Sequence, residues 1–100
     1  RVTMENSHQK GLLSKISVMR HYTQRGWYVY NETMGTGPID IVIVNPNTGE
    51  VRFIDVKTMS FRSSTAKRPN TMINRSTSDV QKKLGVKLVY YNTETGDVKE

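Results

Sequence analysis

The sequence predicts an α/β fold in which helices flank a mixed central sheet. An amphipathic stretch near the N-terminus has helical spacing, two β-rich runs are separated by a short turn, and a second capped helix precedes another β-rich run. The order is therefore helix, three strands, helix, then a strand or hairpin. Because the chain has 100 residues, we expect one domain over residues 1–100.

The first helix is predicted over about residues 5–25, where apolar residues recur every three or four positions. These are Leu12, Leu13, Ile16, Met19 and Tyr22. Gly26 is the expected stop. Extended backwards, the inward stripe reaches Glu5, His8 and Gln9, so polar groups continue the face that packs on the sheet. They form either a frayed first turn or part of a site.

Residues 27–30 form the first predicted strand, and residues 38–44 and 51–57 form a hairpin rich in Ile, Val and Phe. A four-residue loop from Pro46 to Gly49 pairs Asn45 with Glu50. Counting back along both strands then puts Asp40 opposite Asp55, whereas a three-residue loop would send Asp40 to the other face. The functional interpretation depends on this register.

In the predicted register Asp40, Asp55 and Lys57 share one face of the hairpin. Two like charges facing each other across a ladder are destabilising, so sheet stability alone does not explain the pair. A divalent cation would explain it. Mg²⁺ takes one or two carboxylates plus waters and substrate phosphate, and Lys57 would orient a water or stabilise developing negative charge.

The segment from Thr58 to Ser78 contains no acidic residue and is predicted to be a long basic loop. Its cations suit the phosphates of a nucleic acid; they are Arg62, Lys67, Arg68 and Arg75. Ser76 or Ser78 is expected to cap a short helix through Leu84, with Gly85 as its end. Residues 86–92 then form a strand, and a turn like that of the hairpin leads to a final strand near Val98.

The composition of the chain limits the kinds of molecule that it can bind. The formal net charge is +6 and the pI is about 9.8, which favours a polyanion such as DNA, although charge alone does not exclude RNA or an anionic surface. There is no cysteine, so a metal must be bound through oxygen or histidine. No stretch is apolar enough to span a membrane. We expect a cytoplasmic protein, or one in a host's cytoplasm if it is phage-encoded.

The residues Pro38-Ile39-Asp40, followed by Asp55-Val56-Lys57, resemble the PD-(D/E)XK nuclease signature. With the flanking elements, the chain is similar to the restriction-endonuclease-like αβββαβ core of small Holliday-junction resolvases. The resemblance implies Mg²⁺, with Mn²⁺ as a substitute, bound by Asp40, Asp55 and the Val56 carbonyl, while Lys57 assists the attacking water. Gln81 resembles a polar residue that many members present beside the site, and it is a candidate DNA-binding residue.

The resemblance fails at Lys15, where many resolvase-like members place a metal-binding glutamate. Glu5 on the inward stripe is a substitute candidate as a metal ligand. The resemblance implies a DNA endonuclease selective for branched DNA, acting as a homodimer because closed twofold dimers are the commonest oligomers. Three alternatives stay open: a sequence-specific homing or restriction-type endonuclease, a catalytically inactive DNA-binding module of the same fold, and a ribonuclease or RNA-binding protein.

Overall fold

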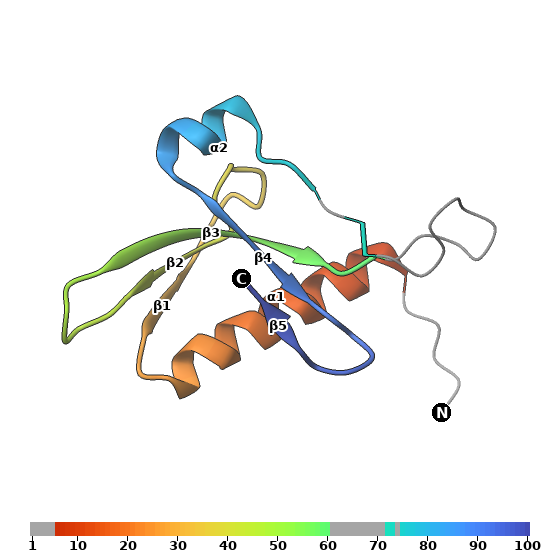
Figure 1. The fold of residues 1–100 in the computed structure, drawn as a ribbon, viewed down its shortest axis with the longest axis horizontal. Coiled ribbons are helices and arrows are strands. Elements are labelled where there is room, and N and C mark those ends of the chain that lie inside the picture. Colours follow the sequence, from red (N-terminus) through yellow and green to blue (C-terminus); the bar gives the residue numbers. More distant parts are fainter. Residues whose placement is uncertain (1–5, 61–71, 74) are drawn as a thin grey trace.

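The computed structural model describes residues 6–60, 72–73 and 75–100. Its elements, in chain order, are α1 (Ser7–Gln24), β1 (Tyr28–Asn31), β2 (Ile41–Val44), β3 (Val51–Thr58), α2 (Asp79–Leu84), β4 (Lys87–Tyr91) and β5 (Val98–Lys99). The α/β class with a mixed sheet and helices is therefore confirmed (Figure 1). None of the helices in the described residues is long and apolar enough to cross a membrane.

The five strands lie in the sheet in chain order, from β1 at one edge to β5 at the other. Strands β1, β2 and β3 form an antiparallel meander, whereas β4 pairs parallel with β3 after the crossover through α2. Ile41 pairs with Ile54 and Val44 with Val51, and the Asn45 amide donates to the Glu50 carbonyl at 2.8 Å. The predicted four-residue loop and the register of the hairpin are confirmed.

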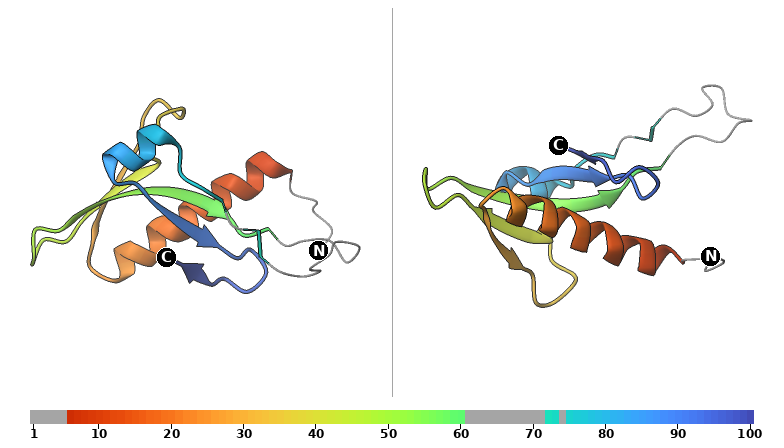
Figure 2. Two further views of the ribbon diagram at one scale, coloured as in Figure 1. Left: turned by 45° about the horizontal axis from the view of Figure 1, so that its top comes forward. Right: turned by 90° about the horizontal axis from the view of Figure 1, so that it is seen from below.

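Helix α1 packs on one face of the sheet, which Figure 2 shows edge-on in its right view. Its buried residues are Ser14, Val18 and Tyr22, whereas Leu12 is 58% exposed and Ile16 is 51% exposed. The predicted inward stripe was therefore wrong at Leu12 and Ile16, whereas Tyr22 is buried and Met19 packs against the core as predicted. The apolar residues of this helix form two overlapping stripes, and the one that faces the sheet is the one with a small residue, Ser14, close to the strands.

Polar contacts explain this orientation of α1. The Ser14 and Thr58 hydroxyls lie 2.6 Å apart, and the Tyr22 hydroxyl donates to the Glu100 carboxylate at 2.7 Å. A leucine in place of Ser14 would not fit so close to β3. Gln9, expected on the inward face, is exposed and instead closes a capping box with Asn6, which starts the helix.

Helix α2 is as predicted. Ser78 is its N-cap, Gln81 completes a capping box, and Gly85 ends it in the left-handed conformation with φ of 72°. The helix lies beside the loop that leads from β1 into β2, as both Figure 1 and the left view of Figure 2 show. The Gln81 side chain contacts that loop by donating to the Pro38 carbonyl at 2.9 Å.

Candidate active site

The candidate site lies where β2 starts and β3 runs on past it. In a continued antiparallel ladder, the Val56 amide would meet the carbonyl of Ile39. Instead it donates to Oδ2 of Asp40 at 2.8 Å, while the Asp40 amide donates to the Ile54 carbonyl at 2.9 Å. The Asp40 carboxylate thus replaces a backbone acceptor just before the start of β2, and this holds it beside Asp55.

Asp55 projects from the face of β3 opposite α1, because its neighbours Ile54 and Val56 pack toward the helix. It is 9% exposed, and its Oδ2 accepts from Nε2 of Gln81 at 2.9 Å. Lys57, two residues along the strand, places its Nζ 3.3 Å from the same oxygen. Helix α2 therefore covers one side of this carboxylate through Gln81, and Lys57 covers another.

Asp55 lies close enough to Asp40 to raise its pKa. Burial and a hydrogen bond with Asp55 raise the pKa of Asp40 to about 6, and the charge of Asp55 adds to this. The Val56 amide and the charge of Lys15 act in the opposite direction. A carboxyl group that shares its surroundings with a second carboxylate resists ionisation, which is what an added cation would relieve.

Lys15 is the residue at which the family resemblance fails, and it acts on this same site. Its positive charge is among the causes that lower the pKa of Asp40. The first helix therefore places a positive charge near enough to affect Asp40, where the resemblance implies an anion. Lys15 and Lys57 together balance the two carboxylates in charge.

The atoms at this site suit a hard divalent cation. In a strand, the N–H and C=O of one residue point to the same edge, so the Val56 carbonyl points to the edge where its amide meets Asp40. Two carboxylates and one carbonyl are a donor set that Mg²⁺ accepts when waters or phosphate oxygens complete it. Within the described part of the chain, no three His, Cys, Asp or Glu side chains cluster as a metal site. Among the described residues, the site thus offers two carboxylates, Asp40 and Asp55.

Several predicted residues are not tested by this geometry. Glu5, Arg62, Lys67 and Arg68 lie outside the described residues. Arg75 is described, and its amide donates to the Tyr90 hydroxyl at 2.7 Å while its guanidinium donates to the Ser60 hydroxyl at 3.3 Å. Arg75 is thereby held near the end of β3.

A cavity of about 390 Å³ lies at the end of β3 and shares Val56 and Lys57 with the carboxylate site. Arg75 and the start of α1, including Lys10, also line it. Sequence reasoning missed Lys10, although Lys10 lies one helical turn before Ser14 and so shares its face. Assigning Ser14 to the inward face would have identified Lys10.

Comparison with known proteins was made by sequence and by structure. No protein-family model matches the sequence, and no curated protein is similar to it in sequence. The structure is similar to that of a bacterial homing endonuclease, I-Ssp6803I, with a TM-score of 0.65 and 14% sequence identity. The alignment covers 94% of this chain and 67% of that chain. At this identity the likeness shows a shared fold.

Proposed function

We propose that this chain is a metal-dependent endonuclease that hydrolyses phosphodiester bonds in DNA. The observation that carries the proposal is the convergence of Asp40 and Asp55 beside Lys57 at one edge of β3. The net charge of +6 and the fold shared with a homing endonuclease support a nucleic-acid substrate. In this proposal Asp40, Asp55 and the Val56 carbonyl hold Mg²⁺, for which Mn²⁺ substitutes.

A bound Mg²⁺ would supply the charge that neutralises the phosphate and the acidity that yields a nucleophilic water. The protein's own groups supply position. The Val56 amide fixes Asp40 through Oδ2, and Gln81 fixes Asp55 in the same way. Because the described contacts engage Oδ2 of each carboxylate, Oδ1 of each is the atom that we assign to the metal.

Lys57 has a separate role in the proposal. Its ammonium lies 3.3 Å from Asp55 and its side chain is 36% exposed, so it contacts the carboxylate and solvent at once. A group in that position can hold the attacking water or a non-bridging phosphate oxygen as negative charge develops. Gln81 has no direct role in this chemistry and orients Asp55.

The proposal also concerns which kind of DNA is cut. Branched DNA is the expectation from the resemblance to resolvases, and a homodimer would let two sites cut two strands. The homing endonuclease of similar fold favours a second candidate, a duplex cut at a preferred sequence. The short chain offers few elements for base readout, which favours the branched substrate.

A catalytically inactive DNA-binding module is also favoured by one observation, the Lys15 charge that acts on Asp40. The two functions differ in a cleavage assay. The assay compares a labelled four-way junction, linear duplexes including a randomised pool, single-stranded DNA and an RNA duplex, each with Mg²⁺, Mn²⁺ or EDTA. Asp55→Asn is the control because its amide oxygen still accepts from Gln81.

We expect cleavage of at least one DNA substrate with either metal, none with EDTA, and none with Asp55→Asn. Cutting of the junction alone would support the resolvase-like substrate, whereas cutting of a subset of the duplex pool would support the sequence-specific one. Binding without cutting under every condition would refute the endonuclease and leave the inactive module.

A further inference from the structure

The cavity at the end of β3 is lined by more basic than acidic side chains. Lys10 from α1, Lys57 from β3 and Arg75 from the segment before α2 line it, and Glu94 is the one acidic residue among the residues described as lining it. Residues that carry hydroxyl groups also line the cavity, among them Ser7, Thr58 and Ser60. Guanidinium, ammonium and hydroxyl donors around one cavity are the groups that bind phosphate oxygens.

Two of these cations are held in place by the fold. The Arg75 backbone is tied to Tyr90, which is 7% exposed, and its guanidinium is tied to Ser60. Lys10 lies in the first turns of α1, whose position on β3 is set by the hydrogen bond between Ser14 and Thr58. The two residues come from segments far apart in the sequence and line the same cavity, where an anion would meet both positive charges.

The cavity adjoins the candidate active site. Val56 and Lys57 belong to both, and the strand residue Val56 contacts Asp40 through its amide. A ligand that places one anionic group in the cavity and the neighbouring group at the carboxylate site must carry repeated anionic groups along one chain. A nucleic-acid strand has this chemistry, with a phosphate at every nucleotide.

We propose that this cavity is a subsite for the backbone phosphate next to the scissile one, held jointly by Lys10 and Arg75. The inference rests on the proposed function, because it takes the carboxylates as the place where the strand is cut. Its role would be to position the strand, since phosphate contacts fix register without reading sequence. Lys10 and Arg75 are then positioning residues, and Lys57 is shared with the reacting phosphate.

The test is the salt dependence of binding to a short labelled DNA duplex in EDTA, where cleavage does not interfere. Each phosphate contact contributes about 0.9 to the slope of log K against log salt concentration. If Lys10 and Arg75 hold one phosphate, the slope of Lys10→Ala/Arg75→Ala falls by about one relative to wild type. A fall of about two would mean two separate phosphates, and no fall would mean that the cavity binds none; either result overturns the proposal.

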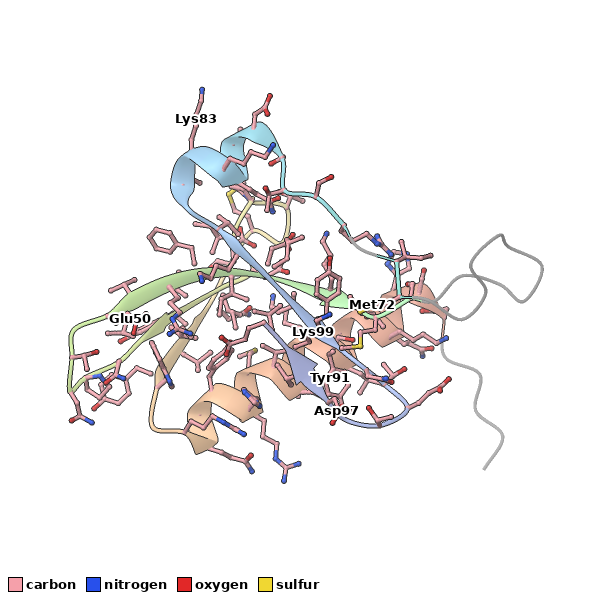
Figure 3. All side chains as sticks on the ribbon, in the orientation of Figure 1. Glu50, Met72, Lys83, Tyr91, Asp97 and Lys99 are labelled. Atoms are coloured by element: carbon pink, nitrogen blue, oxygen red, sulfur yellow. The ribbon has the colours of Figure 1, made fainter. Side chains whose placement is uncertain are left out.

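Lys83→Ala is the matched control, because Lys83 lies on α2 and points away from the sheet in Figure 3. It should leave the affinity within about twofold of wild type, since a distant exposed charge is screened by salt. If Lys83→Ala weakens binding as much as Lys10→Ala, the effect is one of net charge and the subsite does not exist.

A second variant is expected to bind DNA more tightly, a result that misfolding would not produce. Glu94→Gln removes the acidic group from the cavity wall, and its backbone amide still donates to Asn92 in the turn. We expect tighter binding of the duplex, by about threefold to tenfold at low salt. Asp97→Asn removes the same charge from the same turn, where Figure 3 labels Asp97. Because Asp97 does not line the cavity, its replacement should have a smaller effect. Equal gains from both variants would contradict the subsite.

A competition experiment distinguishes binding of a phosphate in a DNA strand from binding of free inorganic phosphate. Inorganic phosphate should compete with the duplex no better than sulfate of the same ionic strength. Selective displacement by inorganic phosphate would make the cavity a free-phosphate site and overturn its assignment to the strand. Because these measurements need no cleavage, strand-phosphate binding in the cavity can be detected even if the endonuclease proposal fails, and it can be absent while cleavage is observed.

Discussion

Replacing Asp40 by Asn separates the structural role of this residue from its proposed role in metal binding. In the wild type, Oδ2 of Asp40 accepts the Val56 amide, and the Oδ1 of an asparagine can accept it equally well. The substitution removes the charge that burial and Asp55 disfavour. We therefore expect Asp40→Asn to be folded, more stable than the wild type at pH 8, and unable to cleave DNA.

The size of the gain follows from the raised pKa of Asp40. Its value of about 6 compares with 3.8 for the free group, and at about 1.4 kcal/mol per pH unit the difference corresponds to about 3 kcal/mol. Because Asp40 is half-buried, solvent screening reduces this to roughly 1.5 kcal/mol. In a domain of this size such a gain raises Tm by about 6 to 12 °C.

The direction of the pKa shift of Asp40 also determines how the stability gain of Asp40→Asn depends on pH. Above pH 6 the folded wild type must keep the carboxyl ionised at a cost, whereas below pH 3.8 the group is protonated in the folded and unfolded states alike. The advantage of Asp40→Asn should thus be full at pH 8, fall as the pH is lowered from 6 to 3.8, and vanish below about pH 3. Thermal unfolding of both proteins across this range measures it.

Asp40→Ala is the matched control. It also removes the charge, but it leaves the Val56 amide without its acceptor, which costs about 1 to 3 kcal/mol. We expect Asp40→Ala to unfold at a lower temperature than Asp40→Asn at every pH. Equal stability of the two variants, or an Asp40→Asn protein less stable than wild type at pH 8, would refute this account of the site.

Three further predictions concern the same site and the helix beside it. Affinity for Mn²⁺ should fall about tenfold for each pH unit below 6, because the metal must displace the proton from Asp40, and a titration at several pH values measures this. Lys15→Glu should tighten Mn²⁺ binding by adding a carboxylate where a cation now acts on Asp40; unchanged or weaker affinity would place Lys15 too far away. Leu12→Gln, on the exposed face of α1, should change the free energy of unfolding by less than about 0.5 kcal/mol, whereas Val18→Ala, in the core, should cost about 2 kcal/mol in urea unfolding.

The hairpin and α2 could be predicted from sequence because local chemistry specifies them. Asn45 accepts two backbone amides within the turn, and Gly49 takes the positive φ of 76° that closes it, so loop length and register follow. A serine cap and a terminal glycine specify α2 in the same way. The position of Asp40 opposite Asp55 is a consequence of that register.

The orientation of α1 could not be predicted, since it depends on contacts between distant segments. The pairing of Ser14 with Thr58 and of Tyr22 with Glu100 spans 44 and 78 residues, and no periodicity in the helix encodes either one. Hydrophobic spacing favoured Leu12 and Ile16 because it counts apolar residues without weighing how closely the helix must approach the sheet. Because the predicted orientation of the helix was wrong, Lys10 was not identified as a candidate site residue and Gln9 was assigned to the wrong face.

The most direct test of the proposed active site is the binding of Mn²⁺ to the protein without DNA, followed by electron paramagnetic resonance, because it does not require the substrate to be known. We predict one bound Mn²⁺ per chain at pH 8, competed by Mg²⁺ and lost in both Asp40→Asn and Asp55→Asn. A wild type that binds no Mn²⁺, or variants that bind it as well as the wild type, would contradict the assignment of this carboxylate pair as a metal site.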